Sequence, residues 1–164
     1  MTKQEALVPV PAGNAAKYFS YREAWGRIRK SIAHGYHLEA VTLEESIMSD
    51  RLSSYLVRVG AVGPDAKLER ESFAKLIKNW RSCVPEPISD AHYSDLQMAV
   101  DAWRSRRNRI VHGIVKSHPG AAPQDVLDFK REAEETARQG ERLAKCLCNW
   151  YRREKARLKR SSAA

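Results

Sequence analysis

The sequence predicts an all-α protein, an antiparallel up-and-down bundle of four to five helices in one domain. Apolar residues recur at steps of three and four in several separate segments, which is the spacing that lines one face of a helix. Alternation at period two is absent, as are the Asn-Gly and Asp-Gly pairs that favour tight hairpins. A length of 164 residues suits a single domain with one substantial core.

The first half of the chain contains two long predicted helices. Residues 1–17 show no periodicity and are expected to form a flexible N-terminal arm. An apolar stripe from Tyr21 to Ile32 predicts the first helix, which Gly35 is placed to end as a C-cap. A second stripe runs from Leu38 to Val59 without a break, and Glu45 is its one charged member.

Two further helices are predicted in the middle of the chain. The shorter one carries the apolar residues from Phe73 to Trp80 and is stopped by Pro85. Ser89 or Asp90 is expected to cap the other helix at its N-terminus. Its stripe consists of Tyr93, Leu96, Val100, Trp103, Arg107, Ile110 and Ile114. Arg107 is the only charged residue in that stripe.

The last predicted helix begins at Gln124 and runs towards Leu158. Its inner face is expected to combine apolar residues with small ones that allow close helix approach: Phe129, Ala133, Ala137, Gly140, Ala144, Leu147 and Tyr151. The bundle domain is therefore predicted to span residues 18–158, and residues 159–164 are expected to form a disordered C-terminal tail.

The formal net charge of +9 is concentrated in two segments. Four arginines lie between Arg104 and Arg109, and six cationic residues lie between Arg152 and Arg160. Such clusters favour a polyanionic partner, and nucleic acid is the commonest polyanion inside cells. For the C-terminal cluster, a solvated basic helix is an equally good interpretation.

Compartment and cofactors are constrained by what the sequence lacks. No run of about 18 apolar residues and no secretory signal is present, so we expect a cytoplasmic protein without membrane contact. The three cysteines lack the paired spacing of a zinc site and are expected to be reduced. No carboxylate cluster suited to a pair of metal ions is apparent, so neither a metal nor a cofactor is expected.

Arg107 and Glu45 each place a charge in an apolar stripe. Burying such a charge costs several kcal/mol unless it is paired or open to water. We therefore expect the two stripes to face one another or a shared cleft, with Glu45 orienting or neutralising Arg107. A purely structural salt bridge remains an alternative, because ion-pair networks also occupy the contacts between helices.

Arg104, Asn108 and His112 follow one another at steps of four and form a polar row beside the stripe. Arg107 lies about 140° around the helix axis from His112, so a shared site requires a groove between helices or a dimer axis. A histidine can move the proton of a ribose 2′-hydroxyl, and an arginine can hold the phosphoryl oxygens. Asn108 can position either the phosphate or the imidazole. These properties favour metal-free cleavage of RNA.

The string from Arg107 to Gly113 resembles the motif of HEPN domains, in which an arginine with a polar neighbour stands a few residues before a histidine. The stretch from Glu44 to Leu52 is similar to the acidic helix that accompanies this motif. The resemblance implies a helical bundle that dimerises, joins the two motif helices in a basic cleft and cuts RNA without metal. Such proteins often act as toxins or defence effectors, some of them with an antitoxin or another partner protein.

We therefore predict a homodimeric endoribonuclease with Arg107, Asn108 and His112 as catalytic residues. Glu45 and Arg104 are the predicted supporting residues. The predicted RNA contacts are Arg106, Arg109, Arg152 and Arg153. A HEPN-like module that binds RNA or a protein without cleaving RNA is the main alternative, and a purely structural bundle is the other.

The string from Arg29 to Gly35 repeats the spacing of the motif, including the histidine and the glycine that follows it. Spacing alone is therefore a weak signal. Arg107 stands inside its apolar stripe, whereas Arg29 lies beside its stripe and is followed by a lysine. The stripe context favours His112 over His34.

Overall fold

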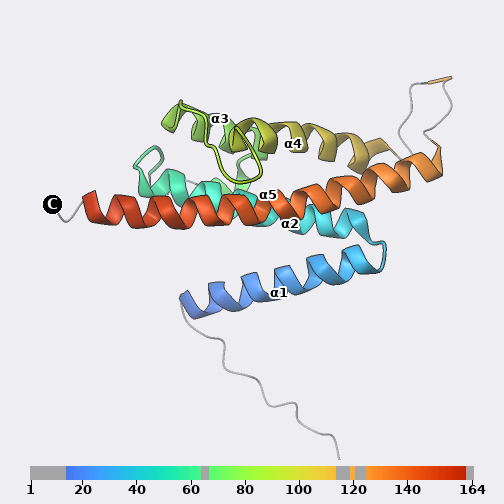
Figure 1. Ribbon diagram of the computed structural model, residues 1–164, viewed down its shortest axis with the longest axis horizontal. Helices are drawn as coiled ribbons and strands as arrows, with labels where there is room; N and C mark the ends of the chain where they lie inside the picture. Colours follow the sequence, from blue (N-terminus) through green and yellow to red (C-terminus); the bar gives the residue numbers. More distant parts are fainter. Residues whose placement is uncertain (1–13, 64–66, 114–118, 121–124, 162–164) are drawn as a thin grey trace, which may run out of the picture.

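Figure 1 shows the computed structural model of the chain, which describes residues 14–63, 67–113, 119–120 and 125–161. Its secondary structure consists of helices, and no strand occurs within these ranges. The prediction of an all-α bundle is confirmed. Most of the predicted N-terminal arm, and most of the connection after the motif helix, lie outside the described residues.

Five α-helices and one short 3-10 helix make up the described chain: α1 (Asn14–Ala33), α2 (His37–Arg58), η1 (Leu68–Arg70), α3 (Phe73–Cys83), α4 (Leu96–Gly113) and α5 (Val126–Ser161). The helices α2 and α5 run side by side in the same direction and form the centre of the bundle. The helix α1 covers one side of this pair, and α3 and α4 cover the other (Figure 1). Consecutive long helices run in opposite directions, as predicted.

The predicted end of the first helix at Gly35 is confirmed. Gly35 has a φ of 79°, the left-handed conformation that glycine adopts without steric cost. The backbone N–H of Tyr36 donates to the carbonyl of Ser31 at 2.8 Å, and that of Gly35 donates to the carbonyl of Ile32 at 3.3 Å. These two bonds satisfy the last carbonyls of α1 and turn the chain directly into α2.

The predicted start of α4, the helix that carries Arg107 and His112, is wrong. Neither Ser89 nor Asp90 caps α4, and Tyr93 precedes the helix. Asp95 is the cap, because its Oδ1 accepts from the backbone N–H groups of Gln97 and Met98 at 2.9 and 3.3 Å. Asp90 instead accepts from the N–H groups of His92 and Tyr93 and closes a separate turn before α4.

The predicted range of the bundle domain, residues 18–158, is too short at both ends. Residues 14–17 belong to α1 rather than to an arm, and the Nζ of Lys17 contacts Asp50 of α2 at 2.9 Å. Residues 159–161 belong to α5 rather than to a tail. Leu158 still packs against the core at this end of the helix, which explains why α5 continues there.

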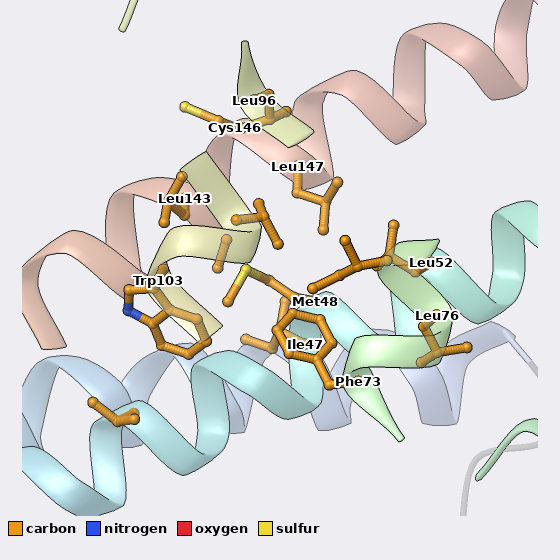
Figure 2. Packing of buried hydrophobic residues seen from close by; sticks show 14 of the residues in the cluster. Ile47, Met48, Leu52, Phe73, Leu76, Leu96, Trp103, Leu143, Cys146 and Leu147 are labelled. Carbon is orange, nitrogen blue, oxygen red and sulfur yellow. The ribbon is translucent and has the colours of Figure 1, made fainter. Parts of the chain in front are cut away.

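The predicted inner face of the last helix is confirmed, because all seven of its residues are buried. Figure 2 shows Met48 of α2, Trp103 of α4 and Leu147 of α5 converging on one apolar volume. The indole Nε1 of Trp103 donates to the backbone carbonyl of Thr136 at 2.9 Å, which satisfies its polar atom inside the core.

The close approach of α2 and α5 occurs at Gly140. A Cβ at this position would lie 2.8 Å from Cζ2 of Trp103 and would overlap the carboxyl group of Glu44. Glu44 has no exposed surface, and neither of its carboxyl oxygens has a hydrogen-bond partner among the described residues. Burial, reinforced by the charge of Glu141, raises the pKa of Glu44 to about 9. Glu44 is therefore protonated at neutral pH.

Candidate functional site

A groove of about 750 Å³ lies between α2, the start of α3 and the second half of α4. We call it the α2–α4 groove. Its charged and amide-bearing lining residues are Glu45, Asp50, Glu71, Arg104, Arg107 and Asn108. A volume of this size is typical of sites that bind small molecules or parts of larger ligands.

Arg107 and Glu45 form an ion pair inside this groove, as their places in the two stripes predict. The contact joins Nε of the guanidinium to Oε2 of the carboxylate, and the two side chains are 23% and 22% exposed. Burial raises the pKa of Glu45, although the neighbouring positive charge of Arg107 opposes that shift. The two charges therefore stabilise each other in a partly desolvated position.

Asn108 contacts the same guanidinium. Nη1 of Arg107 donates to Oδ1 of Asn108 at 2.9 Å. Within the described residues, Glu45 and Asn108 engage Nε and Nη1, which leaves Nη2 of Arg107 to bind an acceptor in the groove. Arg104, the other arginine in the lining, forms an ion pair with Asp101 at 2.9 Å.

His112 lies outside the residues that line the groove. It is exposed and stands one residue before the end of α4. Asn108 and His112 share one face of α4, and four residues of helix separate them by about 6 Å along the axis. The structure thus brings Glu45, Arg104, Arg107 and Asn108 to one groove, but it leaves His112 open to solvent.

The predicted RNA contacts are divided between two regions away from the groove. Nη1 of Arg106 donates to Oε1 of Gln139 at 3.1 Å, and Arg109 forms an ion pair with Glu132, so both arginines face α5. Arg152 and Arg153 are exposed near the C-terminal end of α5. Adjacent arginines of α4 therefore serve different sides of that helix.

Sequence reasoning missed the hydroxyl groups and two of the carboxylates of the groove. Thr42, Ser46, Ser49 and Ser53 line it from α2. These four residues recur at steps of four, three and four, which is a signal for a polar row beside the apolar stripe. Asp50 and Glu71 also line the groove, where Lys17 and Lys75 balance their charges at 2.9 Å each.

The second copy of the motif lies elsewhere, at the end of α1. Nδ1 of His34 lies 2.8 Å from the backbone carbonyl of Lys30, and its ring stacks on Tyr36 with centroids 6.4 Å apart. His34 therefore caps the C-terminus of a helix, a position that suits a histidine for structural reasons alone. Its arginine, Arg29, is exposed and makes no ion pair within the described residues.

In comparisons with protein-family models, with curated proteins and with solved structures, the chain found no match. None of the helices in the described ranges has both the length and the apolar character needed to cross a membrane. Among the same residues, no group of three or more His, Cys, Asp and Glu side chains is placed to hold a metal ion.

The coupling between Glu45 and Arg107 is measurable with Glu45→Gln, Arg107→Gln and the double variant. Each single substitution leaves one half-buried charge unpaired, whereas the double variant leaves none. We therefore expect the costs of the two single substitutions to add up to more than the cost of the double variant. Urea unfolding should give a coupling energy of about 1–2 kcal/mol. The exposed pair Glu23 and Arg27 provides the control, with an expected coupling below about 0.5 kcal/mol. Equal coupling in both pairs would contradict the special character of the groove pair.

Proposed function

We propose that this protein is a metal-independent endoribonuclease of the HEPN type that acts as a homodimer. One observation carries the proposal: Arg107 is held half-buried by Glu45 and Asn108 in a groove, five residues before the exposed His112 of the same helix. Within the described residues, the contacts with Glu45 and Asn108 engage Nε and Nη1 of the guanidinium. The proposed site thus combines Arg107, which binds phosphate, with His112, which carries a proton.

In the proposed reaction, the imidazole of His112 accepts the proton of a ribose 2′-hydroxyl. The 2′-oxygen then attacks the adjacent phosphorus, and the bond from phosphorus to the 5′-oxygen breaks. The leaving 5′-oxygen takes up a proton, so the products are a 2′,3′-cyclic phosphate and a 5′-hydroxyl. Arg107 binds the phosphoryl oxygens as negative charge builds on them, and Glu45 keeps its guanidinium oriented.

A homodimer fits the position of His112. This residue lies about 140° around α4 from Arg107, so one protomer does not aim both side chains at a single phosphate. Two motif helices brought together enclose the exposed histidines between them. The histidine of one protomer then accepts the proton from the 2′-hydroxyl, and that of the other donates to the 5′-oxygen.

The alternative is a HEPN-like module that binds RNA or a protein without cutting RNA. It is favoured by the charges of the α2–α4 groove, because both of its arginines already have carboxylate partners. In either form we propose a cytoplasmic protein with a role as a toxin or defence effector, held in check by an antitoxin or another partner protein.

The test uses the purified full chain with single-stranded RNA and with tRNA in the presence of EDTA. We expect cleavage that leaves 2′,3′-cyclic phosphate ends, and none of a 2′-O-methyl RNA of the same sequence. The His112→Ala variant, purified in parallel, controls for contaminating nucleases. Binding without cleavage would favour the alternative. A strict monomer by light scattering would remove the composite dimer site.

A further inference from the structure

The outward face of α5 carries positive charge along most of the helix. Arg138, Arg142, Lys145, Arg152 and Lys159 are all exposed and fall on one face of the helix, with Asn149 and Ala156 completing the steps of three and four. Between Arg138 and Lys159 the helix rises by about 30 Å. We call this face, continued to Arg160, the α5 track.

Charge balance differs between the two halves of the track. In the first half, Arg138 pairs with Glu134 at 2.8 Å and Lys145 pairs with Glu141 at 2.6 Å. Beyond Tyr151, the last buried residue of α5, five cations form no ion pair within the described chain: Arg152, Arg153, Lys155, Lys159 and Arg160. Their mutual repulsion within three turns weakens the helix, so a polyanion that neutralised them would stabilise it.

The track continues from α5 onto α4. A shallow pocket of about 340 Å³ is lined by Arg106 of α4 and by Arg138, Gln139 and Arg142 of α5, with Glu135 as its one carboxylate. Arg106 and Arg142 form no ion pair in the part of the chain that the structure describes. Arg107, the next residue of α4, lines the α2–α4 groove, so neighbouring arginines of α4 face the pocket and the groove.

The shape of this surface favours a polynucleotide over a membrane. A helix that lies in a bilayer needs an apolar face opposite its basic one. The apolar face of α5 is buried against the rest of the bundle, from Phe129 to Tyr151. A straight row of exposed arginines and lysines instead suits the evenly spaced phosphates of a nucleic acid backbone, whose bound counterions it releases.

We propose that the α5 track binds the sugar-phosphate backbone of RNA and leads the strand across Arg106 towards the α2–α4 groove. This inference rests on the proposed function, because that function makes RNA the substrate. Contact with the backbone does not depend on base identity, so the track supplies affinity rather than sequence preference.

The test compares two variants of the full chain that lose the same charges. The track variant carries Arg152→Gln, Arg153→Gln and Lys159→Gln. The control carries Arg22→Gln, Arg29→Gln and Lys30→Gln, three exposed cations of α1. Binding is measured by fluorescence anisotropy with a labelled 2′-O-methyl RNA of about 20 nucleotides, which resists 2′-hydroxyl attack, and circular dichroism verifies that both variants stay helical.

We expect the track variant to bind on the order of tenfold more weakly at about 150 mM salt, and the slope of log affinity against log salt to fall by about 2. The control should lose less than about twofold. Equal losses in both variants, or no loss in the track variant, would overturn the inference. So would displacement of the RNA by polyglutamate or anionic vesicles as readily as by unlabelled RNA.

The outcomes for the track and for the proposed function are separable. Track-dependent binding without cleavage of unmodified RNA by the wild type would retain the track and reject the ribonuclease. Cleavage that the track variant performs with unchanged affinity would retain the ribonuclease and reject the track.

Discussion

Replacing His112 with alanine is expected to lower the rate of RNA cleavage by about 10²- to 10⁴-fold, the usual contribution of a general acid-base residue. The side chain is exposed near the end of α4, so its removal leaves the core intact. Stability and RNA affinity should therefore stay close to those of the wild type. Single-turnover cleavage, urea unfolding and anisotropy measure the three quantities separately.

The matched control for this substitution is His34→Ala. His34 has the same spacing from an arginine and the same following glycine, but it caps the C-terminus of α1. We expect its loss to leave the cleavage rate unchanged within about twofold and to cost up to about 1 kcal/mol of stability. An equal loss of activity in both variants would contradict the assignment of His112 as the proton carrier.

The second large effect concerns the pH dependence of stability. The pKa of Glu44 is about 9 in the folded protein, against a reference value of 4.5. Between these values the folded chain holds a proton that the unfolded chain has released, so stability falls as pH rises, by up to about 1.4 kcal/mol per pH unit. Glutamine cannot ionise, and Glu44→Gln should remove this dependence. At pH 8 we expect the variant to be more stable than the wild type by about 2–4 kcal/mol.

Urea unfolding at several values between pH 5 and pH 8 checks this expectation. The difference between variant and wild type should shrink towards pH 5, where the Glu44 carboxyl of the unfolded chain approaches its own pKa. Glu135→Gln removes an exposed carboxylate and should give a small difference that does not change with pH. A constant difference for Glu44→Gln would show that Glu44 titrates normally in the folded protein.

Apolar spacing predicted the helices well, because each stripe is a local property of the chain. The inner face of α5 and the end of α1 at Gly35 are confirmed. The predicted start of α4 is wrong because Asp90 and Asp95 are both residues that cap helices well. The stripe counted Tyr93 as helical, although it belongs to the turn that Asp90 closes.

The width of a buried face was harder to predict. A stripe of residues at steps of three and four covers only a narrow arc of the helix surface. In α2 that stripe includes Glu45 and leaves out Glu44. Since α1, α5 and the α3–α4 layer all pack on α2, its buried arc is wider than the stripe and includes Glu44. The sequence carried no sign of this, because the extra burial comes from helices distant in the chain.

The candidate site was predictable only where it follows from the cost of a misplaced charge. That argument predicted the contact between Arg107 and Glu45. It did not find Asp50 or Glu71, because these residues lie outside the apolar stripes and the sequence therefore indicates no cost of burying their charges. The prediction that Arg106 contacts RNA has another basis, the cluster of four arginines. One residue along a helix turns a side chain by about 100°, so Arg106 contacts Gln139 of α5 while Arg107 faces the groove.

The pairing of α2 with α5 bears on how the molecule is made. Glu44 and Gly140 touch in the folded core but are 96 residues apart in the chain. During synthesis, the ribosome delivers α2, α3 and α4 well before the helix that covers them. A nascent chain that ends after α4 already carries Arg107 and His112, yet its apolar surfaces stay open until α5 emerges. The bundle therefore closes only after α5 has been made, and α4 gains a fixed position only then.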